Sequence, residues 1–142
     1  LKKLGKESRF VDGLRCTDAE TMDVVQSVLC GKVNKNLVAQ LNRLGGQAIG
    51  LCGMDGQLFQ AEQLDEKYGL VGKIVKVAPQ VVNDALSCGY IPVISTVALG
   101  IDNDTAAGAP CEVGKKLAEF FNRFVVEGNV VDKRDIWVIF FN

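Results

Sequence analysis

Apolar residues recur at helical spacing in two neighbouring segments near the start of the chain, residues 18–29 and 33–44. Gly31 lies between the two segments, where a residue without a side chain lets a helix break. Gly45 and Gly46 follow the second segment, and glycine is typical of the position just past a helix C-terminus. The pattern therefore predicts two helices that are separated at Gly31.

Shorter apolar runs predict strands in the middle of the chain. Residues 48–51 are apolar and follow a helix, which indicates a short buried strand. Asp55 and Gly56 form a turn signal that is able to join two small strands as a hairpin. Residues 70–77 are rich in β-branched side chains and partly alternate, so we expect a strand at the edge of a sheet.

The strongest strand signal is the run IPVISTV at residues 91–97. It is apolar almost throughout, as expected of a strand that is buried on both faces of a parallel sheet. A helix that begins at Pro79, runs through Leu86 and closes at Gly89 is predicted just before it. Helices that alternate with apolar strands predict an α/β fold with right-handed crossovers.

Two aspartates, Asp102 and Asp104, follow this strand at the start of a run of small residues that we expect to be helical. Ligands of open α/β sheets bind at the carboxyl ends of the strands, so both residues are candidates for a site. A carboxylate at this edge is able to hold a metal ion, to orient a lysine or to cap the helix. Capping alone would account for Asp104, and the pattern does not choose among these roles.

The segment FVDGLRCTD at residues 10–18 places Arg15 just ahead of a helix start. Thr17 and Asp18 are both good N-caps, and Glu20 stands three residues after Thr17, as in a capping box. The backbone N–H groups and the dipole of a helix N-terminus favour an anion, and the planar fork of arginine suits a carboxylate or a phosphate. The alternative is a solvated loop arginine without a ligand.

Composition narrows the classes of function. The chain has 142 residues, 48% of them hydrophobic and 23% charged, which is typical of a single globular domain. The net charge is −1 and the basic residues are scattered, so we expect no nucleic-acid partner. No apolar run approaches the ~20 residues that a bilayer span needs, so we expect no membrane partner.

Cysteine and histidine usage narrows the chemistry further. The five cysteines have no CxxC spacing and indicate reduced thiols in a cytosolic or organelle-matrix setting. Histidine is absent, which removes Ser-His-Asp and Cys-His catalysis and makes a transition-metal site unexpected. The side chains that remain suit phosphoryl or carboxylate ligands, often with Mg²⁺.

Four segments stand in a fixed order: FVDGLRCTD, GKVNKNLVAQLNRLGG, IGLCGMDG and IPVISTVALGIDNDTAAGA. Together they resemble the acetylglutamate kinases of the amino-acid kinase family, most closely the arginine-sensitive form of plants, algae and many bacteria, as a fragment that covers residues 4–109. The resemblance implies a partial αβα sandwich with a mostly parallel sheet. It also implies transfer of the γ-phosphoryl group of ATP, with Mg²⁺, to the side-chain carboxylate of N-acetyl-L-glutamate in arginine biosynthesis.

The resemblance also assigns residues and partners. Arg15 matches the arginine that grips a carboxylate of N-acetyl-L-glutamate, and Asp104 matches the aspartate that organises the catalytic lysines. Asn103 is the amide nearest to the substrate-binding asparagines of the family and stands one place out of register. The segment at residues 31–44 resembles the helix on which these kinases dimerise. A homo-oligomer, and in the plant form a PII-type regulatory protein, are the implied partners.

The departures from the family pattern are equally informative. The glycine-rich loop with a lysine and the Gly-Gly-Gly turn that hold the phosphates have no counterpart in these 142 residues. We therefore expect little or no turnover from the isolated chain. The alternative is a non-catalytic remnant that binds a kinase subunit or a regulatory protein.

The likeness also divides the chain. Residues 1–109 are expected to form the substrate-side part of a kinase domain, and residues 110–142 a divergent helix–strand tail. Pro110 marks the division because it falls where the family helix would continue. The expected location is the cytoplasm or the plastid stroma.

Overall fold

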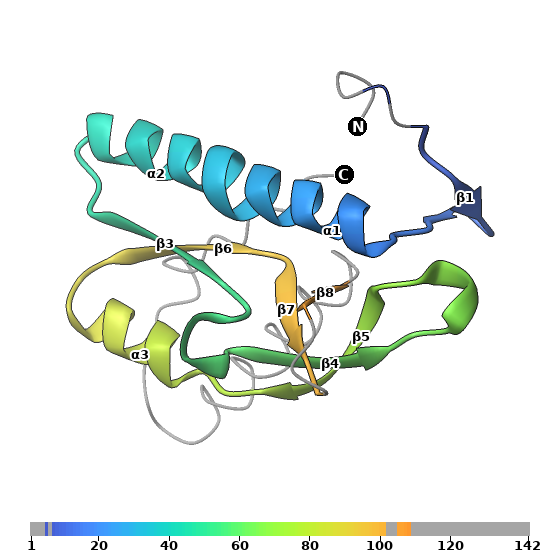
Figure 1. Cartoon of the computed structure of the whole chain (residues 1–142). Helices are drawn as coiled ribbons and strands as arrows, with labels where there is room; N and C mark the ends of the chain where they lie inside the picture. Colours follow the sequence, from blue (N-terminus) through green and yellow to red (C-terminus); the bar gives the residue numbers. More distant parts are fainter. Residues whose placement is uncertain (1–4, 6, 102–104, 109–142) are drawn as a thin grey trace.

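The computed structural model describes residues 5, 7–101 and 105–108 of the chain. Its most prominent element is a long helix that lies across a small parallel sheet, with a second, shorter helix on the other side of that sheet (Figure 1). The two segments of the tail in which the sequence predicts a helix and a strand lie outside the described residues.

The long helix is continuous, and the predicted break at Gly31 is wrong. It consists of α1 (Ala19–Gln26), a π-helical segment η2 (Ser27–Val33) and α2 (Asn34–Arg43). The backbone at both junctions is helical, with φ −59° and ψ −41° at Ser27 and φ −55° and ψ −51° at Asn34. A glycine within a helix costs only about 1 kcal/mol relative to alanine, so packing against the sheet can override the local preference for a break.

The end of this helix follows the sequence prediction. Gly45 adopts φ +89°, a conformation that favours glycine. The N–H of Gly46 donates to the carbonyl of Leu41 at 3.0 Å, and the N–H of Gly45 donates to Asn42 at 3.1 Å. These two bonds form a Schellman motif, which satisfies the last carbonyls of the helix and turns the chain toward the sheet.

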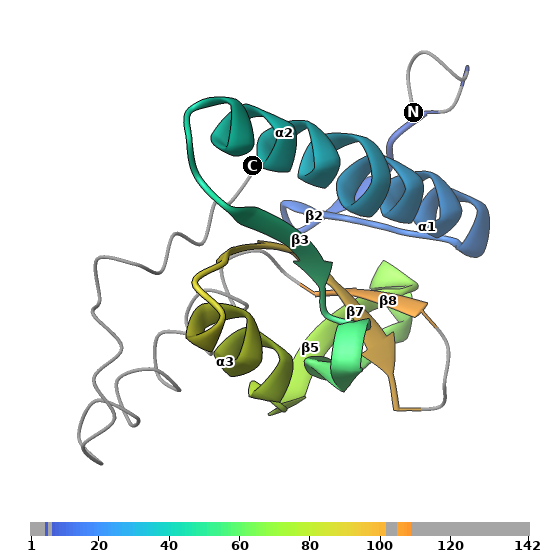
Figure 2. The same cartoon turned by 90° about the vertical axis from the view of Figure 1, so that its left-hand side faces the viewer.

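A pair of parallel strands lies beneath the long helix. Strand β3 (Ala48–Cys52) pairs with β6 (Ile91–Ser95) in a register that runs from Ala48 opposite Ile91 to Cys52 opposite Ser95. Helix α2 covers one side of this pair and α3 (Gln80–Ser87) lies on the other (Figure 2). The α/β class, the parallel pairing and the αβα layering expected from the sequence are therefore confirmed.

A closed, four-stranded barrel follows the parallel pair. Its strands are β4 (Phe59–Gln63), β5 (Val71–Val77), β7 (Val97–Gly100) and β8 (Thr105–Gly108), in the order β4-β5-β8-β7. Parallel and antiparallel pairings alternate around it. The antiparallel pairings have no counterpart in the sequence prediction.

The barrel corrects three local predictions. Strand β5 pairs with both β4 and β8, so it is not at a sheet edge. The small residues after Asp104 form strand β8 rather than a helix, because pairing with β5 and β7 outweighs the helical preference of alanine. Asp55 and Gly56 do not close a hairpin; they lie in the 3₁₀ turn η3 (Asp55–Gln57), and β3 and β4 pair with different partners.

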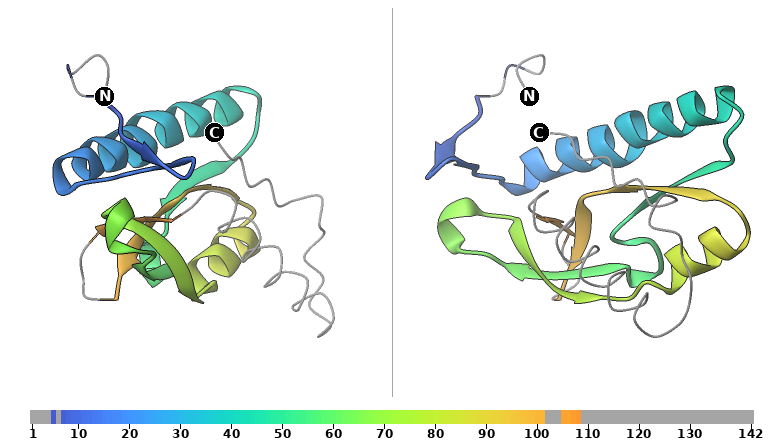
Figure 3. Two further views of the ribbon diagram at one scale, coloured as in Figure 1. Left: turned by 90° about the vertical axis from the view of Figure 1, so that its right-hand side faces the viewer. Right: turned by 180° about the vertical axis from the view of Figure 1, so that it is seen from behind.

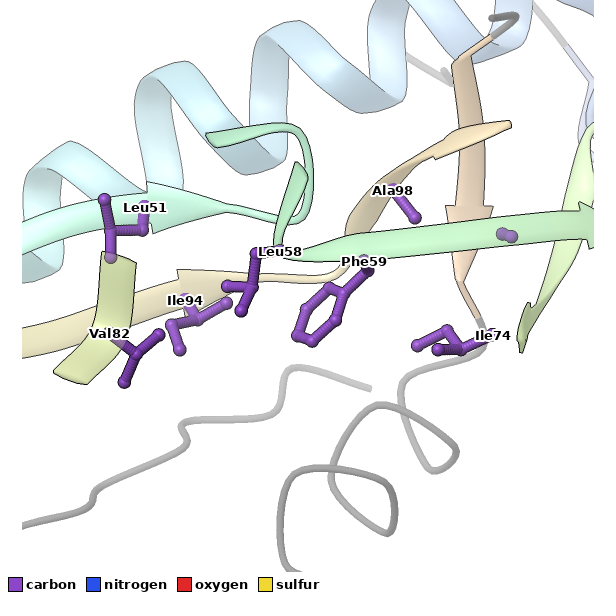
Figure 4. Close-up of a cluster of buried hydrophobic side chains, with 8 residues drawn as sticks. Leu51, Leu58, Phe59, Ile74, Val82, Ile94 and Ala98 are labelled. Carbon is purple, nitrogen blue, oxygen red and sulfur yellow. The ribbon is translucent and has the colours of Figure 1, made fainter. Parts of the chain in front are cut away.

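The apolar core lies between the parallel pair, α3 and the barrel (Figure 4). Phe59, Leu58 and Val82 are completely buried. The cluster is completed by five further buried side chains: Leu51, Ala61, Ile74, Ile94 and Ala98. Burial of each large aliphatic or aromatic side chain contributes roughly 1.5–3 kcal/mol. The cluster therefore holds together elements that are distant in sequence.

No helix in the described part of the chain is long and apolar enough to span a membrane.

A buried polar side chain fixes the long helix to the sheet. Asn34 is 3% exposed, and its Nδ2 donates to the carbonyls of Leu51 at 3.1 Å and Val93 at 2.8 Å. These carbonyls belong to β3 and β6, so one amide bridges both strands. Its Oδ1 has no hydrogen-bond partner and packs against Gly50, where a Cβ atom would collide with it. Position 50 therefore requires glycine.

We expect Asn34→Ala to lower the free energy of unfolding by about 2–4 kcal/mol, because it leaves two buried carbonyls without a donor. Asn36→Ala is the matched control: Asn36 lies on the same helix but is exposed, so its change should stay within about 0.5 kcal/mol. Urea denaturation followed by circular dichroism measures both. Equal destabilisation by the two substitutions would contradict the role of Asn34.

Candidate functional site

The segment that carries Arg15 is a small β-hairpin. Strands β1 (Phe10–Val11) and β2 (Leu14–Arg15) pair antiparallel around Asp12 and Gly13. These two turn residues have φ +50° and +80°, as a type I′ turn requires. The sequence carries an Asp-Gly turn signal for this hairpin at residues 12–13, whereas a hairpin is predicted above only at the later Asp-Gly pair.

Arg15 itself is exposed, and its side chain is placed by an aromatic neighbour. Its guanidinium lies 5.3 Å from the centre of the Phe10 ring, directly across the hairpin. A cation–π contact places the guanidinium beside the ring without using a hydrogen-bond acceptor, so its N–H donors can still bind a ligand. The residue is therefore held and available to a carboxylate at the same time.

An ion pair fixes the hairpin to the body of the domain. Lys67 Nζ lies 2.9 Å from Asp12 Oδ2, and the Tyr68 hydroxyl donates to the same oxygen at 3.1 Å. Both partners come from the turn η4 (Glu66–Tyr68) between β4 and β5, which lies beside the hairpin (Figure 3). The bond from Lys67, and then that from Tyr68, lower the pKa of Asp12, and the bond from Asp12 raises the pKa of Lys67.

Backbone hydrogen bonds continue this docking into the start of the long helix. The N–H of buried Thr17 donates to Tyr68 at 3.0 Å, and the N–H of Leu70 donates to Thr17 at 2.7 Å. Gly69 lies between them with φ +67°, and a Cβ atom there would collide with the Thr17 carbonyl. The close approach of the two chains therefore depends on glycine at position 69.

The helix N-terminus after the hairpin is capped from within the chain. Asp18 is the N-cap, and its carboxylate accepts from the N–H of Thr21 at 2.7 Å. Of the two N-caps that the sequence allows, the structure uses Asp18, while Thr17 is occupied by its bridge to Gly69. One of the helix N–H groups expected to attract an anion is thus already bound by the Asp18 carboxylate.

A second group of polar side chains gathers at the carboxyl ends of β3 and β6. Cys30 Sγ, from the π-helical segment, lies 3.1 Å from Ser95 Oγ at the end of β6. The N–H of Cys52, at the end of β3, donates to Asp55 Oδ2 at 2.6 Å. Sequence spacing gave no sign of this group, because its members come from four separate elements.

The other candidate residues, Asp102, Asn103 and Asp104, lie outside the described residues. The structure does describe the strands on either side of them, β7 and β8, which pair antiparallel. Helix α1 contacts strand β8. The helix begins four residues after Arg15, and the strand begins directly after Asp104.

The glycines at the sheet edge do not form a phosphate cradle. A Cβ atom at Gly50 would meet Asn34 and Lys35, and one at Gly53 would meet Val97 and Phe59, so both glycines serve internal packing. The described residues include no group of three or more His, Cys, Asp or Glu side chains that could hold a metal ion. In the described part of the chain, neither the glycines nor the acidic side chains form a site for a magnesium nucleotide.

The αβα layering defines an α/β domain, and the exposed Arg15 ahead of its long helix is a candidate anion-binding residue. Residues 1–113 match the profile of the Amino acid kinase family. The chain therefore belongs to this family.

Curated relatives carry the name acetylglutamate kinase. One from Clostridium kluyveri is 54% identical over 107 residues, which are 74% of this chain and 38% of the relative. One from Synechococcus sp. is 52% identical over 116 residues, 76% of this chain and 41% of the relative. One from Caldanaerobacter subterraneus subsp. tengcongensis is 45% identical over 147 residues, 96% of this chain and 49% of the relative. The chain thus spans less than half the length of each of these relatives.

Solved structures show the same fold at lower identity. The protein smu.665 from Streptococcus mutans UA159 is 23% identical, with a TM-score of 0.73 over 82% of this chain and 50% of that protein. The N-acetylglutamate synthase from Neisseria gonorrhoeae, solved with coenzyme A and N-acetyl-glutamate, is 18% identical, with a TM-score of 0.67 over 82% of this chain and 27% of that protein. At these identities the likeness establishes the fold alone.

We expect docking of the hairpin to depend on pH through Asp12. Its pKa is lowered in the folded chain, so its stabilisation is present above its ordinary value of 3.8 and is lost as the pH falls through the folded value. The raised pKa of Lys67 matters at alkaline pH, because the stabilisation from Lys67 is lost only as the pH rises through that raised value. The loss of the Asp12 contact at low pH is measured by the NMR shifts of the Thr17 and Leu70 amides, followed from pH 7 to pH 2.

Asp12→Asn should give shifts at pH 7 that resemble those of the acid form, with no further titration of these two amides. Asp23→Asn, an exposed carboxylate on α1, is the matched control and should leave the titration unchanged. If the Thr17 and Leu70 amides titrated identically in Asp12→Asn and in the unmodified chain, Asp12 would not be the group that docks the hairpin.

Proposed function

We propose that this chain is the substrate-side part of an acetylglutamate kinase, which transfers the γ-phosphoryl group of ATP to the side-chain carboxylate of N-acetyl-L-glutamate. The proposal is supported by family membership and by curated relatives of that name at up to 54% identity. A fold relative solved with N-acetyl-glutamate is in keeping with the same substrate. Residues 1–109 make up this part in our proposal, and residues 110–142 a separate tail.

The observation that carries the proposal is the placement of Arg15. Its guanidinium is exposed, stacked on Phe10, and carried by a hairpin that Asp12 fixes to Lys67 and Tyr68. A planar fork held in this way is suited to bidentate recognition of a carboxylate, and N-acetyl-L-glutamate has two. We therefore assign Arg15 to a carboxylate of the substrate.

In the same proposal Asp104 organises the catalytic lysines and Asn103 binds substrate. The contact between α1 and β8 supports a single site, because it brings the element after Arg15 to the element after Asp104. ATP with Mg²⁺ is the phosphoryl donor in this proposal. The described residues contribute the acceptor side only.

We further propose that the longer enzyme is a homo-oligomer in the cytoplasm or the plastid stroma and that a PII-type protein regulates it. Exposed apolar residues in the long helix and at its C-terminal cap support an interface there: Val28 is 42% exposed, and the capping residue Leu44 is 85% exposed. Such side chains gain most from burial against a partner.

The isolated 142-residue chain should show little or no kinase activity. Phosphoryl transfer needs positive charge and backbone donors around the moving group, and these residues include no glycine-rich loop with a lysine for that purpose. A coupled assay of ADP release with N-acetyl-L-glutamate, ATP and Mg²⁺ tests this. Turnover in the range of ordinary kinases, about 1–100 s⁻¹, would show that the chain supplies its own phosphate site.

Binding of N-acetyl-L-glutamate tests the acceptor side independently of turnover. We expect Arg15→Lys to weaken binding by about tenfold or more, since lysine cannot form the paired, planar hydrogen bonds. The matched control is Arg43→Lys, which makes the same substitution in the last turn of α2, away from the site. This variant should bind N-acetyl-L-glutamate like the unmodified chain. Isothermal titration calorimetry measures all three proteins. Equal affinities for the three would remove Arg15 from the site.

A further inference from the structure

Two cysteines from distant parts of the sequence meet at the carboxyl edge of the parallel strands. Cys30 belongs to the π-helical segment of the long helix, and Cys52 is the last residue of β3. Ser95 connects them: its hydroxyl lies 3.1 Å from Cys30 Sγ, and it stands directly opposite Cys52 in the strand register. The helix and the sheet are therefore joined at this point by sulfur-bearing side chains.

The two thiols interact with each other and differ in character. A hydrogen bond from Cys52 is the main cause that lowers the pKa of Cys30 to about 7, and the same bond raises the pKa of Cys52. The Ser95 hydroxyl and the charge of Lys35 also favour the Cys30 thiolate, whereas partial burial and the charge of Asp55 oppose it. The shared bond therefore favours the thiolate at Cys30 and the protonated thiol at Cys52.

The thiol with the lowered pKa, Cys30, is also the more exposed of the two. Cys30 is partly exposed on the long helix, whereas Cys52 is only 5% exposed. A reagent in solution therefore meets Cys30 first. Among the described residues no third His, Cys, Asp or Glu joins the pair in a possible metal site, so the chemistry open to it is that of two thiols. An accessible thiolate beside a buried thiol is the arrangement that thiol–disulfide exchange uses.

We propose that Cys30 and Cys52 are a redox-responsive pair that forms a reversible disulfide in exchange with a low-molecular-weight disulfide such as glutathione disulfide. In the first step the Cys30 thiolate attacks one sulfur of glutathione disulfide, the S–S bond breaks, and a glutathione thiolate leaves. In the second step Cys52, as it loses its proton, attacks Cys30 Sγ and releases a second glutathione thiolate, which takes up that proton. The pair is oxidised by two electrons and glutathione disulfide is reduced by two.

The disulfide would add a covalent link between the long helix and β3. In the reduced chain the nearest fixed contact between these elements is the amide of Asn34, one turn further along the helix. Oxidation would therefore add a covalent bond to the contact with Ser95 that already holds the π-helical segment at the sheet edge, and reduction would remove that bond. This inference does not depend on the proposed kinase function.

The test is a peptide map of the full chain after incubation with glutathione disulfide at neutral pH and rapid alkylation of the remaining thiols. We expect loss of both free thiols of the pair, a Cys30–Cys52 cross-linked peptide as the main product, and full reversal by dithiothreitol. Cys88→Ser removes an exposed cysteine elsewhere and should leave this product unchanged. Cys52→Ser should stop the reaction at a glutathione adduct on Cys30.

A second readout does not depend on substitution of either cysteine. In the reduced chain the rate of Cys30 alkylation by iodoacetamide should rise through a midpoint near pH 7, and Ser95→Ala should move that midpoint upward. The proposal is overturned if both thiols of the pair remain alkylatable in an excess of glutathione disulfide. It is also overturned if cross-links to Cys16, Cys88 or Cys111 are the main products.

Discussion

The fold depends on one buried amide. Asn34 is the only residue of helix α2 that is fully buried, and it donates to carbonyls of both β3 and β6. A two-stranded sheet is marginal by itself, and here the amide joins both strands to the helix above them while the apolar cluster joins them to the helix below. The absence of a side chain at Gly50 is a consequence, because the amide oxygen occupies that space.

From this junction the long helix positions the two candidate sites. At its N-terminal end the hairpin presents Arg15, and the ion pair between Asp12 and Lys67 sets the orientation of that hairpin. In its middle the π-helical segment brings Cys30 to the carboxyl ends of the strands. The proposed carboxylate site and the proposed thiol pair thus lie along one element, and a change in how that element packs on the sheet would affect both.

Periodicity in the sequence was sufficient for the elements whose signals are local. The glycine-capped end of the long helix, the helix that begins after Pro79 and the parallel strand at residues 91–95 follow from spacing and turn chemistry. The predicted helix break at Gly31 is wrong because helix propensity is weak compared with tertiary packing. The helix predicted after Asp104 is a strand, β8, for the same reason. The docking of Asp12 on Lys67 and the meeting of Cys30 with Cys52 join residues far apart in sequence, and no local pattern encodes such contacts. The motif makes Arg15 a candidate, whereas its contact with Phe10 depends on the turn at residues 12–13 that brings the two strands together.

The central claim is that Arg15 is the group that receives a carboxylate of N-acetyl-L-glutamate. The most direct measurement is an NMR titration of the chain with its arginine side chains labelled with ¹⁵N. We expect N-acetyl-L-glutamate to produce a saturable shift of the Arg15 guanidinium resonance together with shifts of the amides of residues 10–18, while the other arginine side chains stay unchanged. Saturable binding that leaves the Arg15 resonance in place, or shifts confined to other parts of the chain, would contradict the account.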